Sequence, residues 1–591
     1  MNLLVNQLVG FCLLLSCLAG LSYLLIRFLK VPSSIAPPAV VGLVIGVLFL
    51  ADFVHVMKLS SQLLLVLGLA GAISAVINFC RERQRLDFRN WANNTSLLWA
   101  LVLGAYVCLY LKNSGRVFYQ WDEFSHWGSV IRAIYTANTF HFNPNPLYFQ
   151  DYPPGTALFS YFVLSIMGYS EGGAIFSYSI MLLAYCIPLF GLAVARGRLF
   201  LLIVFVVSLV LIRKLGHGWN TVLIDHILSV TFAGLVTAYL LIRENNSARW
   251  PLALLFVTVA LAKHAGVSMG LAACGLMVMD SIVVALGTTR QDQSLRARCM
   301  SVTTAICPWI LAILPSLILV MLWGWYVEVS GASRGYGRFG IVELLAQGLG
   351  CCSTEREVTI ATKFSDHFFQ LVGYSPVLLT VCFVGIGFFS ALRANTAVLR
   401  QRQIMALLVM TGTGLFFTLV QLLFYLYAFN EYEALAIASF DRFLNTYYLA
   451  WALSSLGWLV ISWTKETCRG EKANDGWRHK LLLCVAVMAA LLLGLRIFSV
   501  NKIHDEFRAQ RQEIREWVNS VPIPRGINSS TYIVWQGSTA LSFGKHFTRL
   551  FLGSLTKSAI RWALSDILMI FGHASIMSLS CAWSWLALIM F

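Results

Sequence analysis

Two adjacent carboxylates, Asp122 and Glu123, stand in the stretch WDEFSHWG together with His126. A carboxylate can accept the proton of a hydroxyl group as a general base. Carboxylates beside an imidazole could also hold a divalent cation such as Mg²⁺ or Mn²⁺. A structural interpretation stays open, because Asp and Glu cap helices well, FSHWGSVIRAIY has a helical pattern and His126 could be a packing residue.

Charged residues also stand inside or beside apolar runs elsewhere in the chain. Asp225 lies in TVLIDHILSV, Lys263 and His264 lie in LAKHAG, and Arg442 lies in ASFDRF. Charges in membrane helices are costly, so each indicates a function by default. Here too an alternative is open: Asp225 and Lys263 could form a structural pair, and Arg442 could extend to the lipid headgroups.

The elements that carry these residues are predicted to be membrane helices. The chain has 591 residues, of which 58% are hydrophobic and only 12% are charged. Apolar runs of about 20 residues recur, and the backbone in lipid must satisfy its own hydrogen bonds, so the runs should be helices. The net charge of +16 comes from Arg and Lys in short loops between these runs. That is the pattern of a membrane protein, and it argues against a nucleic-acid partner.

The predicted fold is therefore an all-α polytopic membrane protein with about 14 spans. The spans are expected near 3–28, 35–57, 60–80, 96–111, 174–194, 199–212, 221–242, 252–262, 265–286, 303–328, 371–391, 404–428, 440–463 and 479–498. Segment 156–169 is expected to be re-entrant or interfacial. A transmembrane module would cover 1–498, with the loop 112–155 as its catalytic loop.

The basic loops predict the orientation of the spans. Six basic connections fall on one side, which the positive-inside rule makes cytoplasmic: 81–89, 195–198, 243–249, 288–298, 392–402 and 464–480. The loop 112–155 and the charged residues of the spans would then meet at the outer face. Residues 499–591 would form a small outer region, with an amphipathic helix, a strand at STYIVWQGS and a possible last span at 565–591.

Carboxylates and cations at one membrane face suit glycosyl transfer from a lipid-linked sugar phosphate. The acceptor hydroxyl needs a general base, and cations are needed to hold the donor phosphate and offset its charge. An Arg fork fits a phosphate, and Lys acts as a point charge. The donor's prenyl tail lies in the bilayer, which places its phosphate at the headgroup level, where these residues are expected.

WDEFSHWG, DYPPGTALF and ASFDRF together resemble the GT-C superfamily of integral-membrane glycosyltransferases, which use polyprenyl-phosphate sugars. The resemblance implies that Asp122 is the catalytic base and that Glu123 supports it or the acceptor. Its fold would be a helical membrane module with interfacial loop helices, in a bacterial inner membrane with the site facing the periplasm. Membrane arabinofuranosyltransferases are one candidate branch. The number of spans before the loop and the short C-terminal region depart from the family pattern.

The remaining site residues take their expected roles from this hypothesis. Lys263 and Arg442, with His264, would hold the donor phosphate, and Asp225 would orient a cation or a sugar hydroxyl. His126, Asp151 and Tyr152 would contact substrate, and the turn 152–155 would form the floor of the cleft. The acceptor would be a hydroxyl of a glycan, a lipid or a protein.

Two other functions stay open at this point. A transporter or flippase of lipid-linked sugars would also need charges at the outer face, but transporters place polar residues near the bilayer midplane. An O-antigen ligase or polymerase would use Arg and His residues of a late outer loop, such as Arg334, Arg338 and His367.

Overall fold

The protein is represented by a computed structural model. The described part of the chain comprises residues 2–83, 94–142, 147, 149–243, 249–288, 295–332, 346–348, 354–370, 375–392, 394, 396–462 and four positions between 508 and 516. The predicted span 479–498, the predicted strand at STYIVWQGS and the segment 565–591 lie outside these residues.

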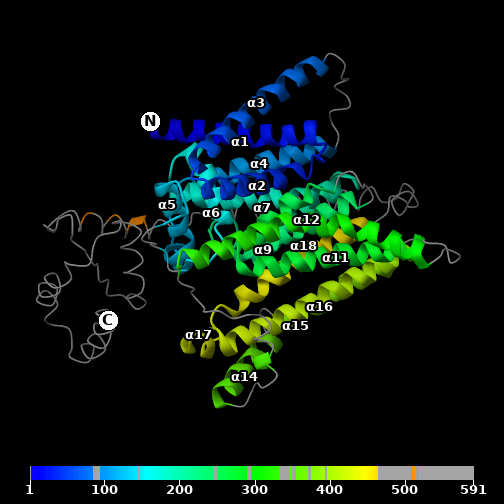
Figure 1. The fold of residues 1–591 in the computed structure, drawn as a ribbon. Helices are drawn as coiled ribbons and strands as arrows, with labels where there is room; N and C mark the ends of the chain where they lie inside the picture. The colour runs from blue at the N-terminus through cyan, green and yellow to red at the C-terminus, as the bar shows by residue number, and fades with distance from the viewer. Residues whose placement is uncertain are drawn as a thin grey trace, which may run out of the picture. The chain divides into compact units, whose positions relative to one another are not determined.

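Every regular element in this described part is helical, as the apolar runs predict (Figure 1). The main helices are α1 (Asn2–Leu29), α2 (Ala36–Phe53), α3 (Met57–Arg83), α4 (Asn94–Asn113), α5 (Gly128–Ala137), α6 (Gly155–Met167), α7 (Glu171–Val194), α8 (Arg198–Lys214), α9 (Asp225–Ile242), α10 (Leu252–Ala262), α11 (His264–Thr288), α12 (Leu295–Val329), α14 (Glu355–Phe369), α15 (Pro376–Leu392), α16 (Ala397–Tyr427), α17 (Glu431–Leu435) and α18 (Phe440–Ser462). A short π-helix, η2 (Glu123–Trp127), precedes α5.

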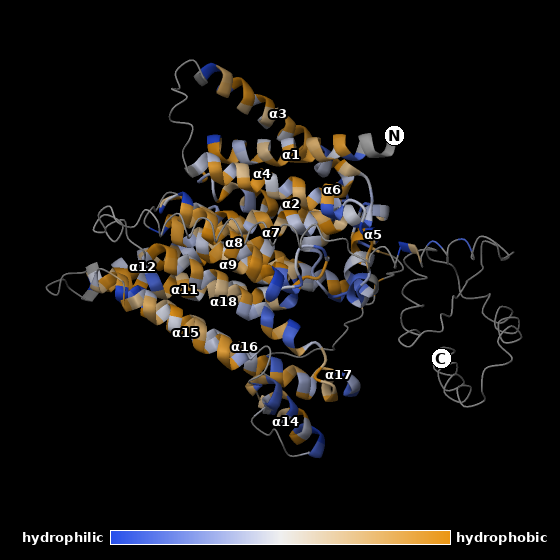
Figure 2. Ribbon diagram, turned by 180° about the vertical axis from the view of Figure 1, so that it is seen from behind, coloured by the Kyte–Doolittle hydropathy of each residue, from blue (hydrophilic) through white to orange (hydrophobic). Residues whose placement is uncertain are grey.

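Nine helices of the described residues are long and apolar enough to cross a membrane, namely α1–α4, α7, α9, α11, α12 and α16. The chain thus has the helices of an integral membrane protein, although the number of about 14 spans is not confirmed. Some predicted spans are short: α10 has 11 residues, about 17 Å of helix against a hydrocarbon core of about 30 Å. Figure 2 shows hydrophobic colour along most of the length of α3 and α16.

Burial separates an inner group of helices from an outer one. The apolar windows of α7 and α9 are 94% buried, whereas those of α3 and α16 are only 17% and 22% buried. Close packing of the inner pair depends on Gly234, because a Cβ there would lie 2.5 Å from the carbonyl oxygen of Tyr185. The exposed apolar faces of the outer helices are the surfaces that lipid would cover.

Side-chain contacts identify two ends of the bundle. At the first, which we call the site end, α2, α10 and α12 end while α6, α9, α11 and α18 begin. Asp52, near the end of α2, accepts a hydrogen bond from the backbone of Phe140, and Tyr326 of α12 donates one to the carbonyl of the same residue. Trp323, also of α12, donates to the carbonyl of Asp151, just before α6. The site end is on the left in Figure 1, where α5 and α17 are labelled.

The opposite end holds a second set of contacts. Arg402, near the start of α16, forms two hydrogen bonds of 2.8 and 2.7 Å with Asp280, and Tyr239 of α9 donates to the same carboxylate. Arg196, which follows α7, donates to the carbonyls of Val460 and Ile461 at the end of α18. The basic connections 195–198 and 392–402 therefore lie at the end opposite to the site, as their charge predicts.

The chain divides into two compact units. The larger comprises Met1–Phe118 and His126–Asn501, and the smaller comprises Tyr119–Ser125 and Lys502–Phe591. The bundle and both of its ends belong to the larger unit. Asp122 and Glu123 belong to the smaller one and are described separately below.

Candidate functional site

Asp225, Lys263 and Arg442 form one charged cluster at the site end. Nζ of Lys263 lies 2.8 Å from Oδ1 of Asp225, and Nε of Arg442 lies 3.3 Å from Oδ2. The Asp225 side chain is 6% exposed, while those of Lys263 and Arg442 are 16% and 21% exposed. Among the contacts of the described residues, Lys263 and Arg442 both face the one carboxylate of Asp225. Ammonium and guanidinium groups are also the side chains that bind phosphate.

Local backbone structure brings these three charges together from separate helices. Asp225 is the first residue of α9, where the helix dipole favours a negative charge. Lys263 interrupts the helical path between α10 and α11 with an extended conformation, which turns its side chain out of both helices. Arg442 stands in the first turn of α18. The ring of Phe443 lies under both cations, 5.4 Å from Nζ of Lys263 and 5.0 Å from Cζ of Arg442.

A second ion pair adjoins this cluster. Nε2 of His264 lies 3.2 Å from Oδ2 of Asp151, and His264 follows Lys263 directly in the chain. The His264 side chain is 53% exposed, and the Asp151 side chain is 15% exposed. The predicted donor-binding residues and Asp151 thus meet in one place. The proposed pairing of Asp225 with Lys263 is present, so any ligand phosphate would share Lys263 with this carboxylate.

Aromatic rings extend the cluster toward α5. The ring of Tyr152 lies 5.2 Å from that of His264, stacks on Trp127 at 5.3 Å and meets His126 at 5.1 Å. His126 is 3% exposed, and neither of its ring nitrogens has a hydrogen-bond partner among the described residues. Burial lowers the pKa of His126 to about 3, and Lys263 adds to the lowering while Asp151 opposes it. His126 is therefore neutral at physiological pH.

Gly155 has a role in this arrangement that differs from the expected one. The pattern DYPPG predicts a rigid turn in which Gly permits a reversal, but Gly155 is the first residue of α6. A Cβ at this position would lie 2.6 Å from the carbonyl oxygen of Leu261 and 2.7 Å from its Cβ. Gly155 is needed for space, because it allows α6 to begin against the end of α10, two residues before Lys263.

The acidic pair in WDEFSHWG belongs to the smaller unit, Tyr119–Ser125 with Lys502–Phe591. Glu123 is fully buried, and its Oε2 accepts hydrogen bonds from the backbone N–H groups of Tyr119 at 2.9 Å and Gln120 at 3.0 Å. The Glu123 side chain thus reaches back to backbone N–H groups that precede η2, as the Glu of a capping box does. Asp122 is half-buried, and its predicted role as the base stays a prediction.

The proposed metal site at Asp122, Glu123 and His126 has no counterpart in the described residues. Within them, no three His, Cys, Asp or Glu side chains are grouped closely enough to hold a metal ion. Two of the three predicted ligands have other surroundings: Glu123 faces backbone N–H groups and His126 is enclosed by aromatic rings. The cation-binding role of these three residues stays a prediction.

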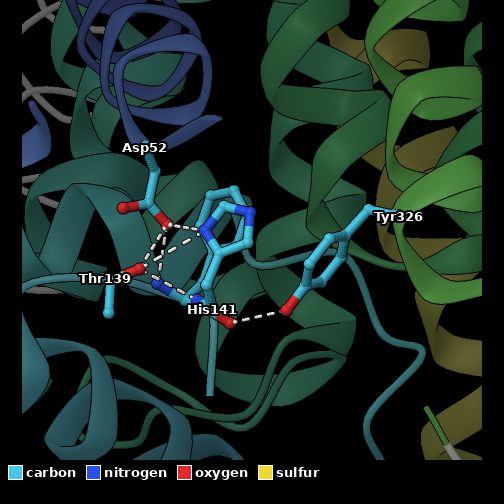
Figure 3. Close-up of polar contacts among 5 residues, drawn as sticks. Asp52, Thr139, His141 and Tyr326 are labelled. Atoms are coloured by element: carbon cyan, nitrogen blue, oxygen red, sulfur yellow. Dashed lines mark hydrogen bonds and ion pairs between the residues drawn. The ribbon is translucent and has the colours of Figure 1, made fainter. Parts of the chain in front are cut away.

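Sequence reasoning missed a polar group at the end of α2 (Figure 3). Oδ2 of Asp52 accepts from Phe140 N at 2.7 Å and from Thr139 Oγ1 at 3.0 Å, and it lies 3.0 Å from Nδ1 of His141. Asp52 is 1% exposed. A lone carboxylate at the end of the apolar run LFLADF was the available signal, since burial of such a charge needs partners.

The residues proposed for a ligase are only partly described. His367 lies in α14, where its Nδ1 is 2.8 Å from the carbonyl oxygen of Lys363 one turn earlier. Arg334 and Arg338 lie outside the described residues. The described part therefore contains no grouping of these three side chains.

The chain was also compared with known proteins. No family model, no curated protein and no solved structure matches it.

Proposed function

We propose that the protein is a membrane glycosyltransferase that transfers a sugar from a polyprenyl-phosphate donor to a hydroxyl group. The main support is the placement of Lys263 and Arg442 around Asp225 at one end of an apolar helical bundle. A phosphate on a prenyl tail would reach such a site from the bilayer, with its tail among the helices and its charge at their ends. The resemblance of WDEFSHWG, DYPPGTALF and ASFDRF to GT-C enzymes supports the same class.

The proposed role of each site residue follows from the charge of its side chain. Lys263 and Arg442 would hold the donor phosphate and stabilise the negative charge that it gains as the sugar leaves. Asp225 would keep both cations in place, and His264 would add a donor at the exposed side. Asp122 remains the proposed base, with the proton of the acceptor hydroxyl passing to its carboxylate. The bacterial inner membrane, a periplasmic site and a glycan, lipid or protein acceptor are part of this proposal.

The first test uses purified protein in detergent and a panel of radiolabelled polyprenyl-phosphate sugars. Binding and transfer are measured separately for the wild type, Asp122→Asn and Arg442→Ala. We expect Arg442→Ala to weaken donor binding about tenfold or more, because a charge-assisted hydrogen bond is lost. Asp122→Asn should keep binding and lose turnover.

Arg213→Ala is the matched control, because Arg213 is an exposed cation in the last turn of α8 and lies outside the cluster. It should bind the donor as the wild type does. If no donor is bound or consumed and neither substitution matters, the enzyme proposal fails. Movement of a fluorescent lipid-linked sugar across liposome bilayers would then favour the flippase alternative.

A further inference from the structure

The turn 436–439 connects α17 to α18 shortly before Arg442, and its backbone is strained. Ile437 has a φ of 46° and Ser439 has a φ of 60°, so both are in the left-handed region. This region is unfavourable for most side chains, and most of all for a β-branched one such as that of Ile437. Residues other than glycine keep such a conformation only where their surroundings impose it. The turn must therefore be held by its contacts.

The hydrogen bonds at the end of α17 account for the conformation of Ile437. Its backbone N–H donates to the carbonyl of Ala434 at 3.2 Å, and that of Ala438 donates to the carbonyl of Glu433 at 2.9 Å. This pair of bonds is the Schellman motif, whose left-handed residue is usually glycine. Here the residue is a buried isoleucine, so the burial of its side chain offsets the strain.

A tyrosine of α16 holds the centre of the turn. The hydroxyl of Tyr425 donates a hydrogen bond of 2.6 Å to the carbonyl of Ala438, the residue between the two left-handed ones. Tyr425 is fully buried, and its ring meets those of Phe429 at 4.9 Å and Phe364 of α14 at 6.0 Å. Close packing of this kind fixes the position of the hydroxyl, and with it the position of the Ala438 carbonyl.

Helix α14 supports both ends of the same turn and lies beside α16 and α17 (Figure 1). Nζ of Lys363 donates to the carbonyl of Leu435, the last residue of α17, at 2.8 Å. The ring of Phe364 lies 5.0 Å from that of Phe440, the first residue of α18. The turn is thus connected to two helices that do not carry any residue of the charged cluster.

The turn in its place determines where α18 begins. The backbone N–H of Phe443 donates to the carbonyl of Ser439 at 3.1 Å, so the first turn of α18 is built on the left-handed residue. Arg442 belongs to this first turn, and the Phe443 ring lies under both Arg442 and Lys263. A guanidinium binds phosphate through directed hydrogen bonds, which weaken when the donor is displaced even though its charge is kept.

We propose that Tyr425 is a positioning residue for phosphate binding, and that it acts through the turn 436–439 on Arg442. The strain of the turn then has a role, because the contacts that impose it also fix the start of α18. The inference rests on the proposed function, whose phosphate site it concerns. It is tested by binding alone, so it does not depend on transfer.

Tyr425→Phe removes the hydroxyl and keeps the ring. The full chain in detergent is titrated with farnesyl phosphate, and farnesol, which lacks the phosphate, shows how much of the binding comes from the prenyl tail. We expect the variant to bind farnesyl phosphate about fivefold more weakly, the value of one hydrogen bond of about 1 kcal/mol. Its affinity for farnesol should not change, because the proposed role concerns the phosphate.

A double-mutant cycle with Arg442→Ala distinguishes positioning from a general loss of stability. If Tyr425 acts through Arg442, Tyr425→Phe should change the affinity of the Arg442→Ala variant by less than about 1.5-fold. A purely structural role would weaken binding by the same factor in both backgrounds. Melting temperatures of all four proteins report stability separately.

Ser439 offers a second test that leaves the core intact, because its side chain is exposed. Ser439→Val places a β-branched residue in the left-handed region and should also weaken farnesyl phosphate binding, whereas Ser439→Asn is the conservative variant that should rescue it. Tyr447→Phe is the matched control. The hydroxyl of Tyr447 likewise joins α16 and α18 by donating to a carbonyl, that of Met410, but it lies more than one turn after Arg442. This variant should lose stability and keep its affinity.

Three results would overturn the inference. They are equal factors in the two backgrounds of the cycle, unchanged affinity in both Tyr425→Phe and Ser439→Val, and a wild type that binds farnesol as tightly as farnesyl phosphate. The proposed function can fail separately. If the cycle gives the expected result but no sugar is transferred from any donor, the proposed function is wrong and this inference stands.

Discussion

Lys263 Nζ lies 2.8 Å from Asp225 Oδ1 and connects the end of α10 to the start of α9. The next residue, His264, contacts a different carboxylate, that of Asp151. Two neighbouring residues thus join three parts of the chain at the site end. This follows from the extended backbone of Lys263, which breaks the helical path. A continuous helix would point neighbouring side chains about 100° apart around one axis.

Replacing Asp225 should show whether Lys263 and Arg442 can bind the phosphate of a lipid. Asp225→Ala removes the carboxylate that both Lys263 and Arg442 contact, so we expect a loss of about 3 kcal/mol in the free energy of unfolding. Added decaprenyl phosphate should recover part of this loss, because it binds only the folded form. The measurement is the melting temperature in detergent, with and without the lipid.

Asp280→Ala is the control for this experiment. It also leaves a buried cation, Arg402, without its carboxylate, but at the opposite end of the bundle. The loss of stability should be similar and the lipid should not restore it. Equal recovery in both variants would mean that the lipid acts as a general stabiliser, and the anion-binding role of the cluster would be wrong.

Gly155→Ala should disturb the site through packing. The new methyl group would clash with the backbone of Leu261, so we expect a cost of about 2 kcal/mol. Because Leu261 stands two residues before Lys263, donor binding should also weaken. Gly104→Ala, in α4, meets no atom within 4 Å and should be neutral or stabilising by about 0.5 kcal/mol. Denaturant unfolding of both variants measures the stability cost, and donor titration measures the change in affinity.

The sequence predicts the class of fold for a physical reason. Apolar runs identify membrane helices, and a charge in such a run, such as Asp225, must have a partner or a ligand. The sequence suggested Lys263 as one partner of Asp225, but it could not show that Arg442 joins them, because these residues come close only through the packing of α9, α10 and α18. Asp52 was missed for the same reason: its partners Thr139 and His141 lie in a loop with no periodic pattern.

The length of the spans was harder to predict. Composition does not distinguish a helix that crosses a bilayer from a short buried one such as α10. Helix α10 is apolar on all sides because its neighbours cover it, as the burial of Leu255, Phe256 and Val259 shows. The breaks at Lys263 and at the start of α6 depend on contacts between helices, which a single run of residues does not contain.

Acid should destabilise the protein through His126. Burial lowers its pKa from 6.5 to about 3, so the unfolded chain binds a proton that the folded chain does not between these values. Stability contributed by the neutral ring is present above about pH 6.5 and is lost as the pH falls toward 3. His126→Phe should flatten the fall in melting temperature between pH 7 and pH 5. An unchanged slope in the variant would show that His126 is not the group responsible.

Asp122 and Glu123 should respond differently to substitution, although they are neighbours. Glu123 is fully buried and accepts from two backbone N–H groups, so Glu123→Ala should cost about 2 kcal/mol in stability. Glu123→Gln keeps an accepting oxygen and should cost less. Asp122→Asn should leave the protein folded while turnover is lost. Thermal unfolding and transfer rates are measured on the same preparations. If Asp122→Asn lowers the melting temperature and leaves turnover intact, both carboxylates are caps, and the base must be sought among the remaining carboxylates, with Asp151 the first to test.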